Sequence, residues 1–200
     1  MRKMKKFAAL AMVATLAAAT FAGCGKKKSD NSNSGSDVWN IGSIGPITGD
    51  AAVYGNAVKD GAQIAVDEIN AAGGINGYQI SFNFEDDKAD PELSSNAYNA
   101  LKDKGMQILM GTVTSGACEA VVGLTGSDNM FQLTPSASAE SVIEGDNVFQ
   151  VCFTDPNQGS ASAKYISDNK LATKVGVIYD SSDVYSSGIF AKFVEAAESC

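Results

Sequence analysis

Short apolar segments alternate with segments of helical periodicity from Val38 onward, and this alternation restricts the chain to few folds. Within 55–72, the apolar residues Val58, Ala62 and Ala65 are spaced by four and three, as on one face of an amphipathic helix. The predicted strands are 38–44, 80–84, 107–110, 130–133, 148–153 and 175–179, and the predicted helices are 55–72, 91–104, 117–124, 157–169 and 188–198, with a helical turn after Ser138. Strands separated by helices form βαβ units. The sequence therefore predicts an α/β fold with a parallel sheet flanked by helices.

The second predicted helix has clear start and stop signals. Asp90 is a good N-cap residue, and Pro91 suits the first helical position. Leu93, Ala97 and Leu101 follow at helical spacing, and a glycine ends the pattern. We predict a helix whose apolar face carries these three side chains.

The N-terminus has the features of an export signal. Residues 1–6 carry four basic side chains, and 7–22 form an apolar stretch interrupted only by two threonines. This stretch is shorter than the roughly 20 residues that a membrane span needs. Two small residues then precede Cys24, which resembles the lipobox of bacterial lipoproteins, where cleavage occurs before the cysteine and its thiol carries a diacylglycerol. We predict a signal peptide over 1–23 and lipidation of Cys24; the alternative is an ordinary signal peptide with an incidental cysteine.

The segment after this cysteine, 25–37, contains no apolar residue. Such a segment cannot bury enough surface to become ordered. We therefore predict that 24–37 is a lipidated cysteine followed by a disordered tether, which holds the protein at a membrane face.

The composition excludes several classes of function. The chain has 15 Lys and Arg against 23 Asp and Glu, a formal net charge of −8, so it lacks the basic surface that nucleic acids require. It has no histidine, which excludes Ser-His-Asp and Cys-His catalysis and any histidine-built metal site. Cys118, Cys152 and Cys200 match no metal-binding spacing and can form at most one disulfide, whose pairing the sequence leaves open. We expect a protein that is not an enzyme and that binds neither a metal nor a cofactor.

In parallel α/β sheets, ligands bind beyond the carboxyl ends of the strands. The loops at those ends are 45–54, 111–116, 134–138 and 180–187. The second and third loops are rich in hydroxyls and precede helix starts, where free N–H groups attract a small anion such as a carboxylate. Neither has the Gly/Lys pattern of a phosphate-binding loop. Ser115 and Ser138 in these loops are therefore candidates for an anion site, and simple helix capping is the alternative for each.

A series of motifs also runs through the chain in a fixed order. They are Ile41-Gly42 to Gly49, Tyr54-Gly55, the run from Ala65 to Gly77, Glu85-Asp86-Asp87, Asp90-Pro91, Ser115-Gly116 and Gln158-Gly159. In this order they resemble the branched-chain amino acid (Leu/Ile/Val)-binding proteins, the extracytoplasmic receptors of ABC importers. The resemblance implies the type I periplasmic-binding fold, whose two lobes close on a ligand. Residues 38–153 would form the ligand-binding lobe 1, and 154–200 the crossover and the beginning of lobe 2.

The resemblance also implies where the ligand binds. The six expected ligand-binding residues are Tyr54, Ser115, Ser136, Ala137, Ser138 and Tyr185. Ser115 would bind the α-carboxylate, and Ser138 would contact the charged head of the ligand. Ser136 and Ala137 would contribute backbone groups, including a carbonyl for the ammonium, and the two tyrosines would line the pocket from opposite lobes. Ser136 departs from the family's more usual alanine and Ser186 from its usual glycine.

We expect the chain to be about half of such a receptor, with the acidic residue for the ammonium in the remainder of the second lobe. The expected function is that of a lipid-anchored protein, at the cell surface or in the periplasm, which delivers an aliphatic amino acid to an ABC permease by hinge closure. A protein of the same fold for amides or urea, and a sensory module without import, are the alternatives.

Overall fold

A computed structural model of the protein describes residues 38–200. The predicted signal peptide, the lipidation of Cys24 and the tether lie outside these residues. The elements, in chain order, are β1 (Val38–Gly45), α2 (Ala52–Ala71), β2 (Gln79–Asp86), α3 (Pro91–Asp103), β3 (Ile108–Gly111), α4 (Ser115–Asp128), β4 (Gln132–Thr134), the 3-10 helix η2 (Glu140–Ile143), β5 (Val148–Gln150), α5 (Asp155–Asp168) and α6 (Val184–Ser199). The predicted alternation of strands and helices is confirmed as far as β5.

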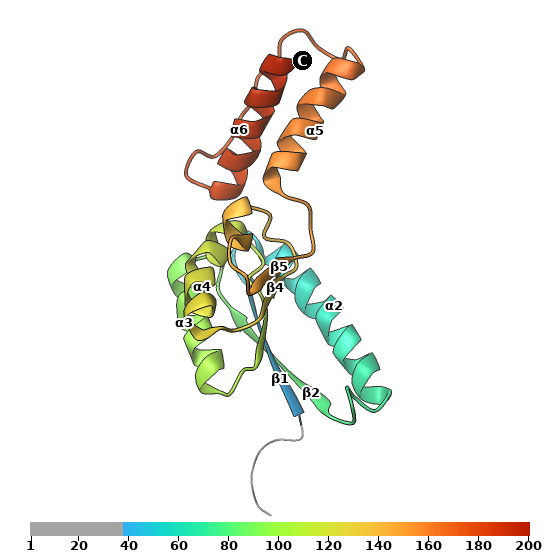
Figure 1. The fold of residues 1–200 in the computed structure, drawn as a ribbon, viewed down its shortest axis with the longest axis vertical. Helices are drawn as coiled ribbons and strands as arrows, with labels where there is room; N and C mark the ends of the chain where they lie inside the picture. The colour runs from blue at the N-terminus through green and yellow to red at the C-terminus, as the bar shows by residue number, and fades with distance from the viewer. Residues whose placement is uncertain (1–37) are drawn as a thin grey trace, which may run out of the picture. The chain divides into compact units, whose positions relative to one another are not determined.

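The five strands form one sheet in the order β2-β1-β3-β4-β5, and every neighbouring pair is parallel. Helices α3 and α4 lie against one face of the sheet, and α2 lies on the other (Figure 1). Because all strands are parallel, their carboxyl ends meet at one edge, which brings together the loops after β1, β3 and β4. The predicted parallel α/β sheet is confirmed.

The core lies between the sheet and the α3–α4 layer. It is built from Ile44 and Leu109 of the sheet, Tyr98 and Leu101 of α3, and Val121 of α4, all of them buried. This packing fixes one face of the sheet and the start of α4, where the site described below lies.

Helix α3 begins as predicted, since the carboxylate of Asp90 accepts a hydrogen bond from the N–H of Leu93 at 2.9 Å. One part of the predicted apolar face is wrong: Leu93 is 39% exposed. The buried face instead contains Ser94 and Tyr98 beside Ala97, because these positions continue the three- and four-residue spacing towards the sheet.

Helix α4 is longer than predicted. It begins two residues earlier, at Ser115, and continues to Asp128, where Asn129 adopts the left-handed conformation (φ 51°) that commonly ends helices. The three glycines inside the helix, Gly116, Gly123 and Gly126, therefore do not interrupt it. Strand β5 is shorter than predicted and ends at Gln150.

The predicted strand 175–179 is wrong. These residues have no regular secondary structure, and Ile178 is fully exposed. Within 38–200, no strand runs beside this segment, so its backbone N–H and C=O groups have no ladder partners. Helices α5 and α6, on either side of it in the chain, pack against each other. None of the helices between residues 38 and 200 is both long and apolar enough to cross a membrane.

Candidate functional site

A hollow of about 260 Å³ opens beyond the carboxyl ends of β1 and β3, where ligands of such sheets bind. Its lining residues are Tyr54, Val113, Thr114, Ser115, Ser136, Asp183 and Tyr185. Four of the six predicted ligand-binding residues are therefore brought together. The other two, Ala137 and Ser138, are buried and do not line it.

Ser115 is the first residue of α4, and its hydroxyl holds the neighbouring loop. Its Oγ accepts hydrogen bonds from the backbone N–H groups of Ser138, at 3.1 Å, and Ala139, at 3.2 Å. The N-cap of α4 is Thr114, so the capping alternative for Ser115 is wrong. A hydroxyl has two acceptor lone pairs and one donor hydrogen. Since two N–H groups occupy the acceptor positions, the Ser115 hydroxyl is left to donate its hydrogen.

The start of α4 supplies further groups for an anion. The first N–H groups of a helix have no partner within it and carry the positive end of the helix dipole. The side chain of Thr114 does not cap them, and its buried Oγ1 has no hydrogen-bond partner within residues 38–200. Thr114 was not among the predicted residues, although its loop was; a hydroxyl directly before a helix start was the available signal.

Ser136 joins the two hydroxyl-rich loops. Its Oγ donates a hydrogen bond of 2.6 Å to the backbone carbonyl of Val113. Ala137, next in the chain, has both backbone groups engaged: its N–H donates to Thr134 Oγ1, and its carbonyl accepts from the side-chain amide of Gln150. The structure thus places Ser136 at the hollow and Ala137 behind it.

Ser138 is paired with an acid that sequence reasoning missed. Its Oγ donates to Oδ1 of Asp155 at 2.6 Å, and the Asp155 N–H donates to the Ser138 carbonyl at 2.9 Å. Ser138 is not an N-cap either, because Ala139 occupies that position of η2. Burial raises the pKa of Asp155 above its ordinary value, and the negative charges of Asp183 and Glu140 raise it further, against the hydrogen bond from Ser138.

Two tyrosines lie at the mouth of the hollow, both on the first turns of helices. Tyr54 belongs to α2 and Tyr185 to α6, and both residues are exposed, Tyr54 more than Tyr185. Asp183, which was not predicted, caps α6: its Oδ2 accepts from the N–H of Ser186 at 3.0 Å. The hollow therefore combines a helix N-terminus and hydroxyls on one side with a carboxylate and an aromatic ring from α6.

The loop before α2 is fixed by Asp86 at the end of β2. Its carboxylate accepts hydrogen bonds from the hydroxyl of Thr48 and from the N–H groups of Ile47, Thr48 and Lys88. Burial acts to raise the pKa of Asp86, but these hydrogen bonds outweigh it and lower the pKa. Asp86 therefore orders the loops on either side of it. No cluster of three metal-ligating side chains occurs between residues 38 and 200.

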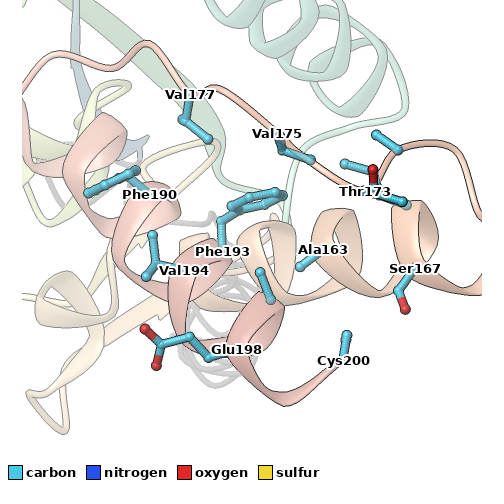
Figure 2. A pocket seen from close by; sticks show the side chains of 13 residues that line it. Ala163, Ser167, Thr173, Val175, Val177, Phe190, Phe193, Val194, Glu198 and Cys200 are labelled. Atoms are coloured by element: carbon cyan, nitrogen blue, oxygen red, sulfur yellow. The ribbon is translucent and has the colours of Figure 1, made fainter.

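A second and larger hollow, of about 580 Å³, lies between α5, α6 and the extended segment that joins them. Figure 2 shows Ala163 of α5, Val175 and Val177 of the segment, and Phe190 and Phe193 of α6 around it. Most of its lining residues have apolar side chains, although Ser167, Thr173 and Glu198 are among them, and it lacks the paired hydroxyl loops of the first hollow. The smaller hollow is therefore the candidate binding site.

The matches to known proteins agree with this geometry. Residues 38–200 match the family model described as periplasmic binding protein. The chain belongs to this family. Members of the family are substrate-binding proteins of ABC transporters that work outside the cytoplasm and are not enzymes, and their type I fold is the one expected from the motifs.

Two curated relatives carry closely related names. The Leu/Ile/Val-binding protein BraC3 of Rhizobium johnstonii is 35% identical over 155 residues, which cover 76% of this chain and 42% of the relative. Leu/Ile/Val-binding protein homolog 3 of Brucella melitensis is 34% identical over 158 residues, which cover 78% and 43%. The chain thus spans about two fifths of the length of the curated relatives it matches.

Among solved structures, the branched-chain amino acid transporter substrate-binding protein LivJ of Streptococcus pneumoniae, in complex with isoleucine, has a TM-score of 0.76 and 34% identity. The similarity covers 80% of this chain and 46% of LivJ. A solute-binding protein from Rhodopseudomonas palustris, in complex with 3,4-dihydroxybenzoic acid, has a TM-score of 0.74 at 19% identity over 82% of this chain and 44% of that protein. The latter likeness concerns the fold alone.

Proposed function

We propose that the protein binds an aliphatic amino acid, of the branched-chain type, and delivers it to an ABC permease. The observation that carries this proposal is the Ser115 hydroxyl, whose acceptor positions are filled and whose hydrogen is free to donate at the N-terminus of α4. A carboxylate is the ligand group that accepts such hydrogen bonds most strongly. The names of the relatives and the isoleucine of LivJ support the choice of an aliphatic amino acid.

The proposed roles of the six predicted residues follow from their positions. Ser115 binds the carboxylate, Ser136 orders the loops around it, and Tyr54 and Tyr185 close the hollow around the ligand. Ala137 and Ser138 act from behind the hollow, as the support of its wall.

The proposed mechanism is hinge closure. Residues 38–153 serve as lobe 1, and 154–200 as the crossover and the beginning of lobe 2. The hollow takes residues from both, since Asp183 and Tyr185 belong to the second part. A ligand that contacts both parts favours the closed state, which a permease can distinguish from the open one.

The proposed location is outside the cytoplasm, with a lipid on Cys24 after removal of residues 1–23. This part of the proposal rests on the sequence pattern alone. Replacement of Cys24 by serine should release the protein from the membrane fraction, and retention in that fraction would contradict lipid anchoring.

A thermal-shift panel on the complete protein, expressed from its gene, tests the ligand. The panel contains leucine, isoleucine, valine, other amino acids, short amides and urea. An aliphatic amino acid at 100 times its Kd should add about 2.7 kcal/mol of stability. Stabilisation only by amides or urea would contradict the proposed ligand.

The role of Ser115 is tested in the same assay. The variant Ser115→Ala should lose about 1.5–3 kcal/mol of ligand affinity. Ser127→Ala, at an exposed position of the same helix, is the matched control and should bind as the wild type does. Import, as opposed to sensing, requires that cells lacking the gene take up labelled isoleucine more slowly.

A further inference from the structure

Asp155 is a buried acid whose burial is unfavourable for folding. Its side chain is 1% exposed, and Oδ2 has no hydrogen-bond partner within residues 38–200. A buried carboxylate oxygen without a partner costs stability, because water has been removed and nothing replaces it. The N-terminus of α5, where Asp155 is the first residue, offsets part of this cost.

The charged groups around Asp155 do not neutralise it. Asp183 at the start of α6 and Glu140 of η2 act on it with like charge. Lys192 of α6 and Asp155 both line a small hollow of about 210 Å³, but the Lys192 ammonium pairs with Glu195 at 2.8 Å. The thiol of Cys152 is a further titratable neighbour in the described part of the chain.

Asp155 is connected to the binding site through a continuous series of hydrogen bonds. It makes two hydrogen bonds with Ser138. The Asp155 Oδ1 accepts from the Ser138 hydroxyl at 2.6 Å, and the Asp155 N–H donates to the Ser138 carbonyl at 2.9 Å. The N–H groups of Ser138 and the next residue, Ala139, then donate to Ser115 Oγ. These two bonds are what restricts the Ser115 hydroxyl to donating.

We propose that Asp155 is a positioning residue: by holding Ser138 it keeps the Ser115 hydroxyl a donor only, and so makes the site select a carboxylate over a carboxamide. This inference rests on the proposed function. A loosened loop would let the Ser115 hydroxyl accept as well as donate, and an amide, which does both, would then bind relatively better.

The test compares L-isoleucine with L-isoleucinamide, which differ only at the carboxyl group. The ratio of their affinities is measured by calorimetry for the complete wild-type protein and for Asp155→Asn, Ser138→Ala and the double variant. Asp146→Asn, an exposed acid in the loop before β5, is the matched control for the loss of one negative charge.

The wild type should prefer isoleucine, and each single variant should lower the ratio about fivefold, whereas the control leaves it unchanged. The double variant should lower it no further, because both substitutions act on the same hydrogen bond. Asp155→Asn replaces its charged acceptor with a weaker neutral one, and Ser138→Ala removes its donor. Asp155→Asn should also unfold at the same or a higher denaturant concentration, since the substitution removes a buried charge that is unfavourable for folding. A purely structural role would instead lower stability and leave the ratio unchanged.

An unchanged ratio in Asp155→Asn, or strictly additive effects in the double variant, would overturn the role of Asp155 and leave the proposed function intact. If Asp155→Asn does not fold, the affinity ratio of Ser138→Ala becomes the test. An unchanged ratio in that variant overturns the proposed role of the Asp155–Ser138 hydrogen bond. A wild-type protein that binds neither compound, or binds both equally, contradicts the proposed function and the inference that rests on it.

Discussion

Removal of the Ser115 hydroxyl should destabilise the protein even without a ligand. In Ser115→Ala, the N–H groups of Ser138 and Ala139 lose their acceptor. Both residues are almost completely buried, so water cannot easily replace the missing oxygen. A buried unsatisfied donor costs about 1–3 kcal/mol, and we expect about 2–4 kcal/mol for the pair.

The assay is chemical denaturation of the complete protein, with the free energy of unfolding compared between variants. Ser127→Ala is again the control, because the Ser127 hydroxyl lies on the exposed face of α4 and donates to the Gly123 carbonyl of the same helix. That change should alter stability by no more than about 0.5 kcal/mol. Equal stabilities for Ser115→Ala and Ser127→Ala would refute the reasoning, since the two N–H groups would then have found other partners.

Three further predictions concern the framework of the site. Tyr98→Phe should lower the free energy of unfolding by about 1 kcal/mol, because the buried Tyr98 hydroxyl donates to Asp128 at 2.8 Å. An unchanged denaturant midpoint of unfolding would contradict this. Gly55→Ala should lower the melting temperature, since a β-carbon at Gly55 would lie 1.8 Å from a backbone carbonyl oxygen of the preceding loop. Gly61→Ala should raise it, since a β-carbon there meets no atom of residues 38–200 within 4 Å; the reverse order would contradict the packing of α2. Burial raises the pKa of Asp87 above its ordinary value, so the stability that the protonated carboxyl contributes is lost as the pH rises through the raised pKa. Asp87→Asn should therefore gain stability relative to the wild type as the pH rises from the acid range towards neutrality, and a constant difference in the free energy of unfolding would refute it.

Most of the sheet and the helices that flank it could be predicted from the sequence, because the local sequence patterns agree with the burial of the residues there. Helix α3 starts at the predicted Asp90 cap, and the parallel sheet follows from the alternation of elements. The segment 175–179 has an equally apolar pattern but is not a strand. A strand needs a neighbour, and a local pattern contains no information about whether one is present.

Part of the candidate site could be predicted from the order of strands and helices and from the side chains in the loops. The rule for carboxyl ends of parallel strands selected the loops that carry Ser115 and Ser136, and the family motifs added Tyr54 and Tyr185. Thr114 and Asp155 were missed because each has an ordinary local explanation, as a helix start. Only the folded chain shows that Thr114 Oγ1 has no partner among residues 38–200 and that Asp155 is buried against Ser138.

The most direct test of the account is a crystal structure of the complete protein grown with L-isoleucine. We expect the ligand in the hollow at the start of α4, with a carboxylate oxygen within hydrogen-bond distance of Ser115 Oγ and of the first N–H groups of that helix. A ligand whose carboxylate lies elsewhere, for example in the larger hollow between α5 and α6, would contradict the central claim.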